Sequence, residues 1–189
     1  GDNLTDELQA KLQKAAFPGV TSSHHLHAMA ALAVTMAEYE IYGKQYASQV
    51  IKNAKALGSA LYEMGLDVMC PHLGFTESHT LAVNVAEQGG GSQVSIDLEK
   101  ANIICNKNML PGDTSSVKPS GIRLGTQELT RVGMEESEME EVARLIYRVV
   151  MKKEDPEKVK KDVWELKKDF TKIRYCLNEG EEAYSFHDI

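Results

Sequence analysis

Two short blocks in the second half of the chain decide how that half folds. Residues 106–111 read Asn-Lys-Asn-Met-Leu-Pro, and residues 120–126 read Ser-Gly-Ile-Arg-Leu-Gly-Thr. We expect residues 120–125 to form a β-strand that carries Arg123 between two glycines, so that its backbone can approach a ligand closely. The planar guanidinium of an arginine can bind a carboxylate through two parallel hydrogen bonds. Arg123 is therefore a candidate carboxylate site, although residue chemistry alone favours a structural ion pair, because most arginines do no more than this.

The hydrophobic period changes near Gly65, where we place a domain boundary. Before Gly65, apolar residues recur every three or four positions and predict helices over 5–15, 23–42 and 44–64, with Gly43 interrupting the pattern between the last two. After Gly65 the period becomes two, which is typical of strands. The predicted strands cover residues 66–70, 81–85, 103–106 and 120–125.

Two helices are predicted among these strands, one over 93–101 with Ser92 as its cap and one over 135–153. The order of elements favours an α+β fold with a mainly antiparallel sheet flanked by helices. From residue 155 a Lys- and Glu-rich stretch with one apolar stripe predicts a solvent-facing helix that reaches Leu177. Residues 181–189 show no pattern and are expected to fray.

Composition narrows the functional classes. The 189 residues carry a net charge of −7, which argues against a nucleic-acid surface. The three cysteines, Cys70, Cys105 and Cys176, are widely spaced and predict neither a disulfide framework nor a zinc site, which fits a reducing cytoplasm. No apolar run approaches the roughly 20 residues of a membrane span, and the first residues lack a basic-then-apolar leader. We therefore expect a cytoplasmic protein without membrane or nucleic-acid partners.

The two blocks resemble the small-domain signatures of serine hydroxymethyltransferases, in which an "NKN…P" segment leads into "SGIR(L/V)GT". The resemblance extends upstream to residues 16–19, Ala-Phe-Pro-Gly, which look like the "FPG" that follows the cofactor lysine in that family, and it covers roughly residues 4 to 150. The Thr, Ser and His residues of the loop at 21–25 and the Lys-rich tail look more like archaeal members. The family's "TTTHK" segment, which holds the lysine, is absent, so the chain looks like the C-terminal part of such an enzyme.

The resemblance implies a fold-type I enzyme that depends on pyridoxal 5'-phosphate. By this resemblance residues 1–22 end the large cofactor domain, 23–65 form linking helices, 66–153 form the small α+β domain, and 154–189 form a C-terminal helical extension. The implied activity is a transferase reaction that interconverts serine and glycine and passes a one-carbon unit to tetrahydrofolate or tetrahydromethanopterin. The implied assembly is a homodimer. Without a Schiff-base lysine the chain contains no catalytic residue and is expected to be inactive alone.

The resemblance also assigns roles to four residues. Arg123 corresponds to the arginine that holds the substrate carboxylate, and Asn108 to the asparagine that contacts the pterin. Ser22 and Ser23 stand where most members have glycines that contact the cofactor phosphate of the neighbouring subunit, and hydroxyls at a helix N-terminus can bind an anion as well. From the residues alone, Asn108 could instead serve turn chemistry before Pro111, and Ser23 could simply cap a helix.

Two alternatives remain open at this point. His24, His25 and His27 invite a metal site, but no Cys lies nearby and no acidic residue is closer than Glu38, so we expect no metal. The chain could also act as a catalytically silent interaction domain or a proteolytic core.

The Ala- and Met-rich helix over 23–42 is expected to be buried against a surface that the chain does not contain.

Overall fold

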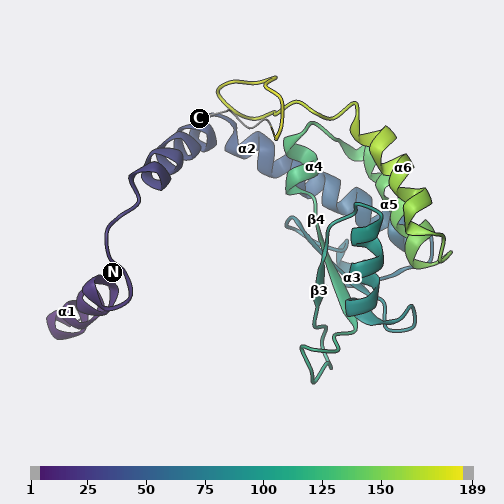
Figure 1. Ribbon diagram of the computed structural model, residues 1–189, viewed down its shortest axis with the longest axis horizontal. Coiled ribbons are helices and arrows are strands. Elements are labelled where there is room, and N and C mark those ends of the chain that lie inside the picture. The colour runs from purple at the N-terminus through teal and green to yellow at the C-terminus, as the bar shows by residue number, and fades with distance from the viewer. Residues whose placement is uncertain (1–4, 185–189) are drawn as a thin grey trace. The chain divides into compact units, whose positions relative to one another are not determined.

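The computed structural model describes residues 5–184 (Figure 1). The chain divides into two compact units, Gly1–Ala37 and Glu38–Ile189, and each is described here by itself. The outermost residues of the predicted segments 1–22 and 154–189, namely 1–4 and 185–189, lie outside the described range.

The first unit contains helix α1 (Asp6–Lys14), which lies within the predicted helix 5–15 and begins one residue after its predicted start. Thr5 caps it by accepting a hydrogen bond of 3.4 Å from the amide of Leu8. Segment η1 (Ala15–Val20) follows, and the backbone leaves helical geometry at Phe17 and Pro18, as expected from a proline that cannot continue a helix.

Helix α2 (Leu26–Glu63) differs from the prediction at two places. It starts at Leu26 and not at Ser23, because the first helical hydrogen bond runs from the amide of Met29 to the carbonyl of His25. Ser23 is therefore not the cap of this helix. The helix also continues through Gly43, since one glycine lowers helix stability by only about 1 kcal/mol and does not end a helix by itself.

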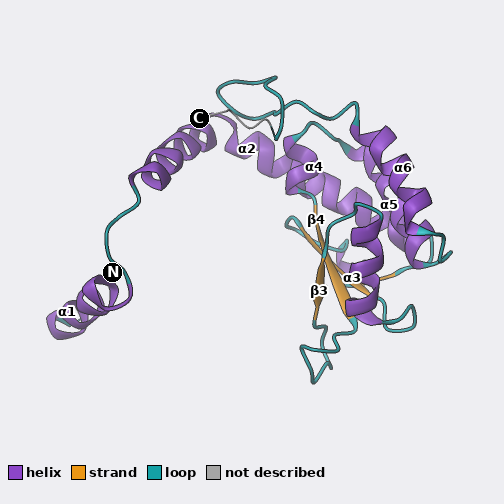
Figure 2. Cartoon of the chain, in the orientation of Figure 1, coloured by secondary structure: helices purple, strands orange, loops and turns teal. Residues whose placement is uncertain are grey.

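The second unit is built on a four-stranded sheet, and every strand pair in it is antiparallel (Figure 2). The strands are β1 (Asp67–Val68), β2 (Thr80–Asn84), β3 (Asn106–Asn108) and β4 (Gly121–Gly125). Their spatial order is β1-β2-β4-β3, so β4 lies between β2 and β3. The predicted α+β fold with an antiparallel sheet is confirmed.

Helices cover one face of this sheet. Leu81 and Val83 of β2 and Ile122 and Leu124 of β4 are buried in the main core. The same core contains residues of α2, of α3 (Gly90–Lys100) and of α5 (Glu136–Val150), and Figure 1 shows α3 running alongside β3 and β4. Each buried aliphatic side chain of this kind contributes about 1.5–3 kcal/mol. The opposite face of the sheet carries the intervening residues of β2 and β4, which are partly or fully exposed at Ala82 and Arg123.

Several boundaries correct the sequence prediction. Strand β3 begins at Asn106, where the predicted strand 103–106 ends. Gly89, with a φ of 118°, precedes α3, and Ser92 lies inside that helix, where its hydroxyl donates to the carbonyl of Val117. A short helix, α4 (Gln127–Arg131), was not predicted, because its five residues show no apolar period.

The C-terminal extension is shorter as a helix than its apolar stripe suggests. Helix α6 covers Pro156–Lys167, with the side chain of Asp155 accepting from the amide of Glu157 at its start. The chain beyond α6 folds back on itself: the amide of Ile173 donates to Glu181, and the amide of Ala183 donates to Thr171. The prediction that residues 181–189 fray is therefore wrong for 181–184.

We predict that Gly91→Ala destabilises the second unit. An added Cβ would clash with the carbonyl oxygen of Gly121 and lie 2.9 Å from its carbon, so α3 would have to move away from β4. Overpacking of this kind costs about 1–3 kcal/mol. Denaturant unfolding measures the loss, and Glu99→Ala on the exposed side of α3 should stay within about 0.5 kcal/mol of the wild type. Equal stability of Gly91→Ala and the wild type would refute the close packing.

Candidate functional site

Arg123 is the middle residue of β4 and lies on the face of the sheet opposite the helical core. It pairs with Ala82 of β2 and with Asn106 of β3, and its side chain is exposed. One guanidinium nitrogen, Nη2, donates to Oδ1 of Asn106 over 3.1 Å. No ion pair of residues 5–184 includes Arg123. The guanidinium therefore keeps most of its donors free for an anionic ligand, and the structural ion pair that residue chemistry alone favours is not formed in this part of the chain.

The strand register brings two asparagines to the same face. Asn106 is directly opposite Arg123, and Asn108 is opposite Gly121, whereas Lys107 is opposite the buried Ile122. Because side chains alternate between the faces of a strand, Asn106 and Asn108 share the face of Arg123, and Lys107 points to the other. The amide of Asn108 donates to the carbonyl of Met109 over 2.7 Å, so its oxygen remains available. Asn106 was not singled out from the sequence, although it stands in the same motif as Asn108.

Asp113 joins the ends of the two motif blocks. Its Oδ2 accepts from the amide of Leu110 at 2.9 Å, from the amide of Ser120 at 2.8 Å and from the hydroxyl of Ser120 at 2.9 Å. These bonds, first of all the one from the Ser120 amide, hold the pKa of the Asp113 carboxyl below its usual value. The carboxylate thereby fixes the loop between β3 and β4. The sequence offered no signal for this role beyond an aspartate next to a glycine.

Ser22 and Ser23 belong to the first unit and precede α2. Both are exposed, and neither hydroxyl forms a hydrogen bond with the residues that the structure describes. Their donors are therefore available to an anion such as a phosphate.

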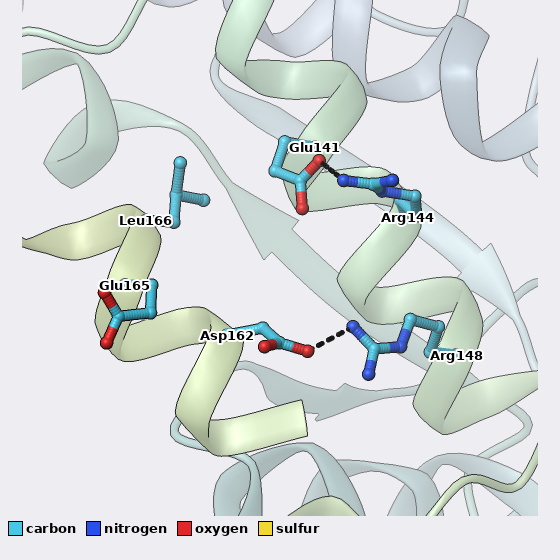
Figure 3. A pocket seen from close by; sticks show the side chains of 6 residues that line it. All are labelled: Glu141, Arg144, Arg148, Asp162, Glu165 and Leu166. Atoms are coloured by element: carbon cyan, nitrogen blue, oxygen red, sulfur yellow. Dashed lines mark hydrogen bonds and ion pairs between the residues drawn. The ribbon is translucent and has the colours of Figure 1, made fainter. Parts of the chain in front are cut away.

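A hollow lies between α5 and α6, with a volume of about 620 Å³, and is lined mainly by charged residues (Figure 3). Arg148 of α5 donates to Asp162 of α6 over 2.6 Å and makes two further bonds of 2.8 Å to Glu154. Glu141 and Arg144 pair with each other along α5. The bond between Arg148 and Asp162 joins α5 to α6. Because these charged side chains already pair with one another, the hollow is not a candidate ligand site.

Other classes of site find no support in the described part of the chain. The rings of His25 and His27 lie 5.5 Å apart, but residues 5–184 contain no group of three or more side chains placed to hold a metal ion. Among the helices of this range, none combines the length and the apolar composition that a membrane span requires.

Comparison with known proteins identifies relatives over almost the whole chain. A family model described as serine hydroxymethyltransferase matches residues 1–146. The serine hydroxymethyltransferase of Methanopyrus kandleri is 53% identical over 182 residues, which are 95% of this chain and 42% of that protein. The corresponding protein of Thermoplasma volcanium is 50% identical over 97% of this chain and 43% of its own length. The chain thus spans about two fifths of the length of these curated relatives.

A solved structure agrees with the sequence matches. The L-threonine transaldolase of Pseudomonas fluorescens superposes with a TM-score of 0.78 and 32% identity, over 86% of this chain and 37% of that one. The sheet and its helices are therefore shared with a larger enzyme.

We predict that Asp113→Asn lowers the melting temperature at pH 7 and that the difference from the wild type shrinks in acid. A carboxyl whose pKa is lowered by folding contributes stability that is present above its unfolded pKa, about 4, and is lost as the pH falls through the folded value. Melting curves from pH 7 down to about pH 2 measure this, with the exposed Asp169→Asn as the control. A difference that stays constant over this range would contradict the role of the carboxylate.

Proposed function

The chain belongs to the serine hydroxymethyltransferase family, and we propose that the whole protein interconverts serine and glycine and exchanges a one-carbon unit with a tetrahydropterin. The observation that carries the proposal is the exposed Arg123, which forms no ion pair within residues 5–184 and lies beside Asn106 and Asn108 on the sheet face opposite the helical core. The carrier would be tetrahydrofolate or tetrahydromethanopterin, and the similarity to archaeal relatives favours tetrahydromethanopterin.

Arg123 would hold the carboxylate of the amino-acid substrate. The hydrogen bond from Arg123 to Asn106 uses only the nitrogen Nη2. Other N–H groups of the guanidinium can therefore form two charge-assisted hydrogen bonds with the oxygens of a carboxylate. Asn106 would fix the orientation of the guanidinium through this hydrogen bond. This interaction fixes the substrate without taking part in bond cleavage.

Asn108 would contact the pterin. A side-chain amide offers donors and an acceptor to the edge of a flat heterocycle, and the oxygen of Asn108 remains free while its nitrogen is bonded to Met109. The Asp113 carboxylate would keep the adjacent loop in place while the pterin enters and leaves.

The cofactor would be pyridoxal 5'-phosphate, which supplies the electron sink for cleavage at the α-carbon. The hydroxyls of Ser22 and Ser23 suit a phosphate, because they are exposed donors ahead of a long helix. We propose that they bind the phosphate held by a neighbouring subunit. The lysine that anchors the cofactor, and with it the catalytic residues, would lie outside residues 1–189, so this chain alone would be inactive.

The domain assignment follows from the same proposal. Residues 1–22 would end a large cofactor domain, 23–65 would link it to the small domain at 66–153, and 154–189 would be an extension of that domain. The protein would work in the cytoplasm, where its amino-acid and pterin substrates are found.

We predict that Arg123→Ala in the full-length protein weakens serine and glycine binding by about 2–5 kcal/mol, because a charge-assisted pair is lost. Its unfolding free energy should change by less than about 0.5 kcal/mol, since Arg123 is exposed. Arg123→Lys should restore little, because a point charge cannot replace the planar fork. Serine titration followed by the cofactor absorbance, together with thermal melting, measures both effects. Unchanged serine affinity, or full restoration by lysine, would exclude Arg123 as the carboxylate site.

We also predict that the protein is a homodimer that uses the first turns of α2. Large apolar side chains there are exposed on the single chain: Leu26, Met29, Leu32, Val34 and Met36 are each more than half exposed. Leu32→Asp should therefore shift the protein toward monomers in sedimentation at micromolar concentration. Leu73→Asp, at a similarly exposed position outside α2, is the matched control. A monomeric wild type, or equal dissociation by both variants, would refute the interface.

A further inference from the structure

Among residues 38–184 of the second unit, three polar residues are completely buried, and all three belong to one hydrogen-bonded network. Asn53 lies in α2, Thr130 lies in α4 and Thr126 directly precedes α4, and each has an exposure of 0%. No buried side-chain nitrogen or oxygen in the described range lacks a partner. A buried polar group that loses its partner is costly, so a network in which every group is bonded fixes the positions of the elements that it joins.

The network runs from the surface of α2 to the end of β4. The amide of Gln49 donates to Asn53 over 2.9 Å. Asn53 donates to the hydroxyl of Thr130 over 2.9 Å and to the carbonyl of Met134 over 2.8 Å. The hydroxyl of Thr130 donates in turn to the carbonyl of Thr126 over 2.8 Å. Both donors of the Asn53 amide are therefore used, and α2 is tied to α4.

Thr126 closes the network with a bond of its own. It directly follows β4, and its hydroxyl donates to the carbonyl of Val50 in α2 over 2.9 Å. Thr126 also stands at the N-cap position of α4, but its side chain makes no capping bond there. The hydroxyl of Thr126 therefore binds α2 and does not cap α4, although capping is the usual role of a threonine at this position.

These contacts hold β4 at both ends. At its start, Ser120 is bound by Asp113, and at its end, Thr126 is bound by α2. Arg123 lies midway between them, on the face of the sheet opposite the core residues of α2, α3 and α5. The strand cannot slide or tilt relative to α2 without breaking the bond between Thr126 and Val50.

We propose that Thr126 is a positioning residue for Arg123: its hydroxyl fixes the end of β4 against α2 and thereby sets where the guanidinium meets the substrate carboxylate. The inference rests on the proposed function of Arg123. It concerns a residue that touches neither substrate nor cofactor, and it acts only through the strand.

The test compares two changes of Thr126 in the full-length protein. Thr126→Val removes the hydroxyl and keeps the shape, whereas Thr126→Ser keeps the hydroxyl. Affinities are measured for serine and for 2-aminoethanol, which lacks the carboxylate, by the cofactor absorbance. Since displacements of about 1 Å can cost up to about 100-fold in a positioned interaction, we expect Thr126→Val to weaken serine about tenfold and 2-aminoethanol less than about twofold. Thr126→Ser should stay within about twofold of the wild type for both.

Combination with Arg123→Ala separates this inference from the proposed function. If Thr126 acts through Arg123, Thr126→Val should weaken serine no further once the arginine is removed. An equal loss in both backgrounds, an equal loss for both ligands, or an unchanged serine affinity would overturn the positioning role. If Arg123→Ala itself leaves serine binding unchanged, the proposed function fails instead. Should Thr126→Val not fold, Thr126→Ala removes the same hydroxyl and is judged by the same outcomes.

Discussion

The side-chain alternation of strand β4 is the constraint on which the rest of the structure depends. Ile122 and Leu124 must point into the core, because they are almost completely buried against the helical layer. Arg123 must then point to the opposite face. A shift of one residue in register would bury the guanidinium and expose the two aliphatic side chains. The stability of the core and the exposure of the candidate site are therefore set by the same strand.

Polar contacts add the precision that apolar packing does not supply. Aliphatic side chains hold the sheet against its helices but tolerate small displacements. The bonds of Asp113 to Ser120 and of Thr126 to Val50 have defined directions and lengths, and they bracket the strand that carries Arg123. A site that binds a planar carboxylate needs this kind of fixed backbone, because a bidentate pair is sensitive to orientation. The contacts of β4 with the helical layer thus help to fix the position of Arg123 on the opposite face of the sheet.

The sequence predicted the parts of this arrangement that follow from local periodicity. Strands β2 and β4 and helix α5 were placed within a few residues, because burial on one face imposes a clear apolar period on each. Strand β3 was misplaced, because the apolar Ile103 to Cys105 lie ahead of the residues that pair with β4. The roles of Asn106 and Thr126 depend on which residues of distant segments face one another. Such contacts are set by the tertiary fold and leave no periodic signal.

The most direct measurement of the central claim is a crystal structure of the full-length protein with glycine bound. The account predicts that two guanidinium nitrogens of Arg123 lie within about 2.7–2.9 Å of the two carboxylate oxygens, with β4 still bound to α2 through Thr126 and Val50. A glycine carboxylate held by other residues, with Arg123 bonded only to Asn106, would contradict it.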